Sequence, residues 1–197
     1  RSTLFPYTTL FRSVIAGAGF FLYHKFVYEV QRAEAMEQMY PAEENFRNQE
    51  FELALNGDGN VLGFSQIISE YGSKAGKAVY FYAGVCELQL GNYEQAIKYL
   101  NSYNGKDAIL KARATACIGD AYVGLEDYGK ALGYFEKAAS TIDNMYAAGY
   151  LLKAGVVCEK LGQNEKAITF YKKIKEQYPQ SMEGYSIDKY ISRIEAE

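Results

Sequence analysis

Apolar residues in the C-terminal two thirds of the chain recur at three- and four-residue intervals, separated by short polar stretches. Residues at such intervals lie on one face of an α-helix. The clearest example is residues 148–181, where a polar turn at 161–163 separates two such runs. Their small and apolar positions are Leu151, Ala154, Gly155, Cys158, Ala167 and Tyr171. This stretch predicts two amphipathic helices joined by a short turn.

Two upstream stretches, residues 80–100 and 115–135, repeat this pattern in the same register. Each carries a glycine in its first run and an alanine in its second, and both markers recur after 35 and then 36 residues. The markers are Gly84, Gly119 and Gly155, and Ala96, Ala131 and Ala167. Two independent markers in one register indicate three copies of one structural unit.

This pattern resembles the tetratricopeptide repeat, a helical hairpin of about 34 residues in which small residues let the two helices touch. The resemblance covers residues 77–185 as three repeats, with Pro179 at the close of the third. It implies an all-α fold, a right-handed superhelical array of antiparallel helical hairpins. Larger side chains at the marker glycines should overpack the helix contacts, at roughly 1 to 3 kcal/mol each.

The turns inside the hairpins differ in one residue. Gly91 and Gly162 supply a glycine at this place in the first and third repeats, whereas Glu126 occupies it in the second. Glycine is preferred there because it adopts positive φ without strain. The second turn is therefore expected either to differ in shape or to be strained.

Both flanks of the array predict covering elements. Residues 41–76 are interpreted as a degenerate N-terminal hairpin, with a helix from Pro41 to Leu55 and a second helical segment at 64–71. Residues 186–197 predict a C-terminal capping helix with Ser186 as its N-cap. Its apolar stripe comprises Ile187, Tyr190, Ile191 and Ile194.

The first thirteen residues are interpreted as foreign to the protein. Residues 3–13, TLFPYTTLFRS, are the translation of a common sequencing-adapter sequence, so residues 1–13 are expected to be an assembly artefact. The alternative is a genuine Thr- and Phe-rich leader.

Residues 14–40 are interpreted as a truncated transmembrane helix followed by a juxtamembrane helix. The uncharged run Val14–Tyr23 is about half of the roughly 20 residues that a span needs, and it ends in aromatic residues. A signal peptide would require a small-residue cleavage site, which is absent after this run. A soluble helix remains the other alternative.

Composition and candidate chemistry add little. A net charge of -3 excludes a general attractive field for nucleic acid. The single His24 has no catalytic neighbour in sequence, and Cys86, Cys117 and Cys158 lack metal-type spacing. Paired-carboxylate motifs and phosphate-binding loops are absent from the sequence. We therefore predict a non-catalytic protein without cofactor, metal, catalytic residue or disulfide.

The resemblance also implies a partner-binding surface, because first helices line the concave side of such arrays. The larger or charged side chains carried over to it are Phe81, Val85, Leu88, Arg113, Asp120, Val123, Leu152, Val156 and Glu159. Small residues Ala78, Ala116 and Gly149 complete the set, and the Lys and Asn clamp of chaperone-binding members is absent. The expected ligand is an apolar helix or extended segment of another protein. The alternative is that the chain's own terminal helices cover part of this surface.

In architecture, the chain resembles membrane-anchored bacterial repeat proteins like the ancillary subunit of the Sec translocon. That resemblance implies a single-pass protein of the inner membrane with periplasmic repeats, whose partners are the translocon or exported chains. A lipid-anchored outer-membrane assembly factor is a second possibility, although no cysteine lies near residue 14. A docking or regulatory subunit of an enzyme is a third. The oligomeric state stays open.

Overall fold

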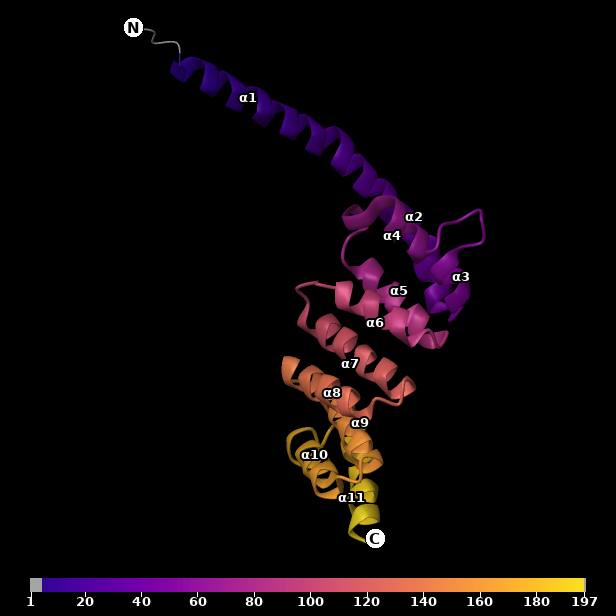
Figure 1. Ribbon diagram of the computed structural model, residues 1–197. Helices are drawn as coiled ribbons and strands as arrows, with labels where there is room; N and C mark the ends of the chain where they lie inside the picture. The colour runs from indigo at the N-terminus through magenta and orange to yellow at the C-terminus, as the bar shows by residue number, and fades with distance from the viewer. Residues whose placement is uncertain (1–4, 197) are drawn as a thin grey trace.

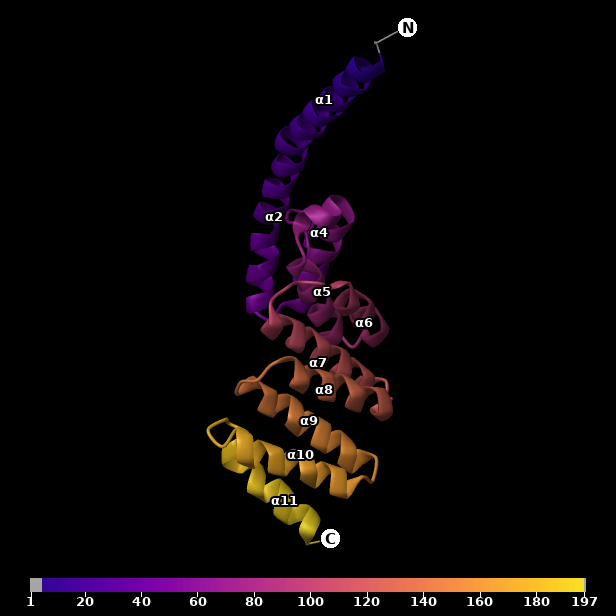
Figure 2. The same ribbon diagram turned by 90° about the vertical axis from the view of Figure 1, so that its left-hand side faces the viewer.

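The computed structural model describes residues 5–196, and all regular secondary structure in this range is helical. Figures 1 and 2 show helices stacked into an elongated array from which α1 projects as a long rod. The longer helices are α1 (Phe5–Tyr23), α2 (Glu29–Arg47), α3 (Phe51–Asn56), α4 (Phe64–Tyr71), α5 (Ala78–Gln89), α6 (Tyr93–Ser102), α7 (Ala108–Gly124), α8 (Tyr128–Thr141), α9 (Tyr146–Lys160), α10 (Asn164–Gln177) and α11 (Ile187–Glu195). A π-helical turn (η1, His24–Tyr28) and two 3₁₀ turns (η2, Gly72–Ala75; η3, Gly184–Ser186) connect some of them.

Three helical hairpins, α5–α6, α7–α8 and α9–α10, form the body of the array, and each packs on the next. In each hairpin the marker glycine lies at the same place, the seam where the first helix contacts the second. A Cβ atom would lie 2.6 Å from Leu100 at Gly84, 2.7 Å from Phe135 at Gly119 and 2.2 Å from Tyr171 at Gly155. Each clashing side chain is buried and comes from the second helix of the same hairpin. The small residue therefore allows the two helices to approach.

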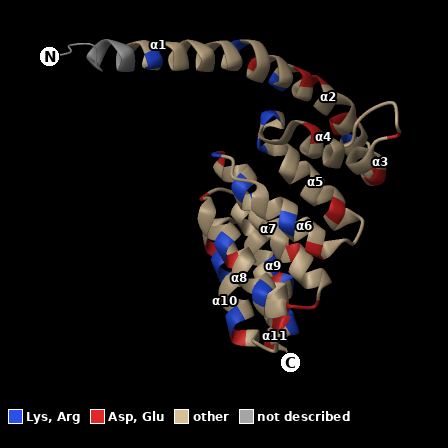
Figure 3. Cartoon of the chain, turned by 45° about the horizontal axis from the view of Figure 1, so that its top comes forward, with Lys and Arg blue, Asp and Glu red and all other residues tan. Residues whose placement is uncertain are grey.

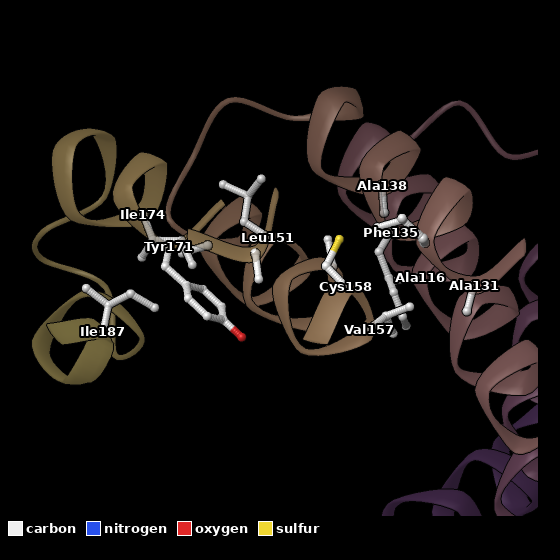
Figure 4. Close-up of a cluster of buried hydrophobic side chains, with 14 of the residues drawn as sticks. Ala116, Ala131, Phe135, Ala138, Leu151, Val157, Cys158, Tyr171, Ile174 and Ile187 are labelled. Atoms are coloured by element: carbon white, nitrogen blue, oxygen red, sulfur yellow. The ribbon is translucent and has the colours of Figure 1, made fainter. Parts of the chain in front are cut away.

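A continuous apolar core links the last hairpins to the C-terminal helix. Figure 4 shows Phe135 of α8, Leu151 and Cys158 of α9, and Tyr171 of α10 within this core. The side chains of Cys158 and Tyr171 are fully buried. Alanines such as Ala131 fill the narrow places between the larger residues.

The three hairpins share one turn geometry. The turn residue has φ 82° at Gly91, 59° at Glu126 and 69° at Gly162. In each turn the next amide donates to a carbonyl five residues earlier, at 2.9, 2.9 and 2.8 Å respectively. Of the two outcomes expected for Glu126, the structure shows the strained one, because a residue with a Cβ adopts the left-handed conformation there.

A fourth hairpin, α2–α3, has the same turn and register. Gln49 has φ 63° and the Glu50 amide donates to the Asn45 carbonyl at 2.9 Å. The fully buried Ala42 and Ala54 are 12 residues apart, as are the marker glycine and alanine of every repeat. The N-terminal hairpin is therefore built from α2 and the short α3.

The expected helix from Pro41 to Leu55 is wrong in both its start and its course. Helix α2 runs through Pro41, whose missing amide removes one hydrogen bond, because buried Ala35 and Met39 hold the preceding turns against the core. The helix ends instead at the left-handed turn around Gln49. The segment aligned with a repeat's second helix, residues 64–71, is the separate helix α4, which packs on α2, α3 and α5.

Helix α11 covers the C-terminal end of the array. Its buried residues Ile187, Ile191 and Ile194 join the core shared with α9 and α10. Ser186 occupies the N-cap position but does not cap the helix. Its hydroxyl donates to the Glu183 carbonyl at 3.3 Å instead, because the preceding 3₁₀ turn brings that carbonyl within reach.

The N-terminal rod runs without interruption from α1 through η1 into α2. From residue 11 to residue 27 its large side chains are exposed, including Val14 at 67%, Phe20 at 69% and Phe26 at 62%. Within the described residues, none of the helices combines the length and hydrophobicity of a membrane-spanning segment. Of the stretch interpreted as adapter-derived, residues 5–13 lie in α1 and residues 1–4 lie outside the described range.

Candidate protein-binding groove

A groove of about 550 Å³ crosses the first helices of the three repeats, α5, α7 and α9. Its apolar lining includes Leu88 from α5, Ile109 from α7 and Tyr150 from α9. Ile109 is 47% exposed, and Tyr146 at the start of α9 is 59% exposed. The groove therefore offers large apolar side chains that nothing in the described chain covers.

Four of the predicted contact residues line this groove: Val85, Leu88, Arg113 and Asp120. Val85 is 8% exposed, so it forms the floor. The small residue Ala116 also lines it.

The remaining predicted residues lie elsewhere. Phe81 is only 2% exposed, so the expectation that it faces a partner is wrong; it packs against Tyr82 and Tyr103 in the core. Val123 and Leu152 are half-buried and pack against the core beside the groove.

Glu159, with the neighbouring Val156, lines a separate depression at the C-terminal end, where α11 contributes Tyr190 and Arg193. Arg193 donates to one oxygen of Glu159, and the Tyr171 hydroxyl donates to the other. Burial and the carboxylate beside it raise the pKa of Tyr171. The chain's own terminal helix thus occupies this part of the predicted surface, as the alternative interpretation anticipated.

The charges in the groove are unevenly compensated. Lys153 on α9 donates to both carboxylate oxygens of Asp120 on α7, each at 2.7 Å, and so ties the two helices together. Arg113 is exposed, and its guanidinium lies 5.7 Å from the centre of the Phe81 ring. Elsewhere on the repeats, both signs of charge are interspersed (Figure 3).

A second hollow of about 340 Å³ adjoins the groove and shares Tyr146 and Tyr150 with it. It is bordered by Met145, Met182 and Tyr185, which are 55%, 87% and 76% exposed. Gly149, one of the expected first-helix positions, lines this hollow, but most of its other residues come from the connections before α9 and after α10, which the repeat register does not place. The available signal was methionine and tyrosine in segments without helical periodicity.

The cysteines are suited to packing rather than to chemistry. Burial raises the pKa of Cys86 to about 12 and that of Cys117, which lines the groove, to about 11. Burial also raises the pKa of Cys158, and all three thiols are free. In the part of the chain that the structure describes, no cluster of three His, Cys, Asp or Glu residues could hold a metal ion.

Stacked helical hairpins with a groove across their first helices define an α-helical repeat protein. The model of the family described as "Tetratricopeptide repeat" matches residues 78–106 and 144–181. The second repeat, α7–α8, lies between these matches and has the same seam and turn.

Solved structures with this fold include two of MamA. A crystal structure of MamA protein is similar with a TM-score of 0.62 and 17% identity, over 84% of this chain and 83% of that one. A second crystal structure of MamA has a TM-score of 0.59 and 17% identity, over 79% of this chain and 92% of that one. At this identity the likeness concerns the fold alone, a helical repeat array.

Proposed function

We propose that this protein is a non-catalytic scaffold that binds an apolar segment of a partner protein in the groove across α5, α7 and α9. The observation that carries the proposal is the groove itself, which presents Ile109 of α7 and Tyr146 of α9 to solvent, with the half-buried Tyr150 beside them. Exposed aromatic side chains in a concave surface are favoured anchors for protein ligands.

The proposal can be tested by displaying random linear peptides to the full-length protein. We expect the selected peptides to be enriched in Leu, Ile and Phe. Tyr146→Ser should abolish that enrichment because it removes a central apolar anchor, whereas Tyr40→Ser should not. Tyr40 is a matched control, since it is 63% exposed but lies on α2, away from the groove. Failure of the wild-type protein to enrich any peptide family would contradict the proposal.

We further propose that the helix from Val14 to Val30 attaches the chain to a lipid bilayer. Its support is the exposure of apolar side chains along this helix, among them Phe20, Phe21 and Phe26, at 69%, 61% and 62%. Large apolar surface of this kind marks a membrane or partner contact. The setting proposed from the resemblance is the bacterial inner membrane with periplasmic repeats, and the translocon or exported chains as partners.

Flotation with vesicles of phosphatidylethanolamine and phosphatidylglycerol tests the attachment. The full chain should float with the vesicles, and the double variant Phe20→Ser, Phe21→Ser should remain in the dense fraction. The matched control Met182→Ser, Tyr185→Ser removes two exposed apolar side chains at the other end of the array and should still float. Equal flotation of both double variants would reject the attachment through this helix.

A further inference from the structure

The groove contains one charge that the protein itself does not neutralise. Among its charged lining residues, Asp120 and Lys153 form an ion pair at 2.7 Å, so their charges compensate each other. Arg113 forms no ion pair with any residue in the described part of the chain. The lining of the groove therefore carries one net positive charge, among apolar residues and the polar Gln89.

Arg113 is also held in place. Its guanidinium lies 5.7 Å from the centre of the buried Phe81 ring, a cation–π arrangement that restricts the side chain. The flanking Ala112 and Ala114 are buried, so the Arg113 backbone is fixed within α7. A positioned guanidinium presents several donors in a planar fork, the geometry that a carboxylate matches.

The surface of the groove continues on both sides of Arg113. Helix α7 packs on α5 and lies before α9 in the stack, so Leu88 borders one side of the groove and Tyr146 and Tyr150 the other, with Val85 on the floor. Beyond Tyr146 the surface continues into the hollow that carries the exposed Met182. A bound segment can therefore continue past Arg113 in both directions, which favours a side-chain carboxylate over a chain terminus.

We propose that Arg113 determines the specificity of the groove by binding the side-chain carboxylate of an Asp or Glu within an otherwise apolar partner segment. This inference rests on the proposed function, because it assumes that the groove binds a protein segment. It adds the chemistry of that segment: large apolar residues on both sides of one acidic residue. An apolar segment with a basic residue at this position would meet an uncompensated like charge and be rejected.

The test uses the full-length protein and a display library of linear twelve-residue peptides held between constant Gly-Ser linkers, so that only internal carboxylates vary. Wild type, Arg113→Gln, Arg113→Lys and Lys172→Gln are compared. Lys172→Gln is the matched control, because it removes one positive charge from the exposed face of α10, outside the groove. Thermal unfolding of each variant checks that the fold is retained.

We expect wild type, Arg113→Lys and Lys172→Gln to select apolar peptides with one Asp or Glu. Arg113→Gln should select apolar peptides without that acidic preference. A synthetic consensus peptide should bind wild type about 10-fold more tightly than its Glu→Gln counterpart, whereas Arg113→Gln should bind the two equally, since a charge-assisted hydrogen bond is lost only in wild type.

Two results would overturn the inference, and they are distinguishable from failure of the proposed function. If the peptides selected by the wild-type protein are apolar but lack the acidic residue, the role of Arg113 is rejected and the groove remains an apolar binding site. The same holds for an acidic preference that persists in Arg113→Gln. A wild-type protein that enriches no peptides would reject the proposed function and this inference together.

Discussion

At the scale of single residues, the turn inside the second repeat concentrates strain at Glu126. Its φ of 59° lies in the left-handed region, which disfavours a residue with a Cβ by roughly 1 to 2 kcal/mol. The first and third repeats place glycine at the same turn position. Replacement of Glu126 by glycine should therefore relieve the strain, because the backbone there already has a conformation that glycine adopts readily.

We expect Glu126→Gly to raise the free energy of unfolding by about 0.5 to 1 kcal/mol, since the relief of strain exceeds the added flexibility of the unfolded chain. Urea denaturation followed by circular dichroism measures the change. Glu126→Ala is the control, because it removes the same carboxylate but retains a Cβ, and should give no gain. An equal gain in both variants would attribute the effect to charge instead of backbone conformation.

For the marker glycines between the paired helices, we expect a substitution to lower the free energy of unfolding rather than raise it. A Cβ at Gly155 would lie 2.2 Å from a ring carbon of the fully buried Tyr171, which has no room to move. Gly155→Ala should lower the free energy of unfolding by about 1 to 3 kcal/mol. Gly133→Ala in α8 is the matched control, since nothing lies within 4 Å of the added Cβ, and alanine should stabilise the helix by up to about 1 kcal/mol. Thermal unfolding of both variants compares the two effects. Similar melting temperatures would contradict the tight contact between Gly155 and Tyr171.

At the scale of elements, α11 seals the end of the last hairpin with a narrow apolar stripe. Ile191 is 8% exposed within this contact, whereas the adjacent Ser192 faces solvent. Ile191→Asp should lower the free energy of unfolding by at least about 2 kcal/mol, because it buries an unpaired carboxylate. Ser192→Asp, which adds the same charge one residue along, should have little effect. Both are measured by urea denaturation, and equal stability would show that α11 does not contribute to the core.

How far sequence reasoning succeeds depends on whether an element repeats. The three hairpins from α5 to α10 were predictable because Gly84 and Ala96 recur in one register. The N-terminal hairpin was predicted within residues 41–76, but its two helices were misplaced, because alanine replaces the marker glycine at Ala42 and the turn residue is Gln49. The sequence around Pro41 predicts a helix start, whereas core contacts of α2 carry the helix through this residue.

The candidate site was predictable to a similar extent. The repeat register brought Leu88, Arg113 and Asp120 to one groove, as expected from first-helix positions. It could not show that Phe81 turns into the core or that Arg193 reaches Glu159, because packing between repeats and against the end helix decides both. These contacts are non-local, and a repeat pattern contains no information about them.

At the scale of the whole molecule, the buried thiols couple stability to pH. Burial raises the pKa of Cys86 from its ordinary 9.0 to about 12. Between these two values the unfolded chain releases the thiol proton while the folded protein retains it. The free energy of unfolding should therefore be constant with respect to this group below about pH 9 and fall above it, by about 1.4 kcal/mol per pH unit for Cys86.

Thermal unfolding from pH 7 to pH 11, with a reductant present, measures this dependence. Cys86→Ala should be less stable at neutral pH because of the cavity it leaves, but its melting temperature should fall less steeply above pH 9. The difference in slope, rather than in stability, is the diagnostic quantity. Parallel pH profiles of the two proteins would contradict the coupling.

The stack of hairpins has a mechanical consequence. Within the described residues, the main contacts of each hairpin are with the hairpins before and after it. Small rotations between successive hairpins add up along the array, so the curvature of its concave side can increase or decrease. We expect such an array to adjust its curvature to a bound partner, and tension between its ends to weaken that binding.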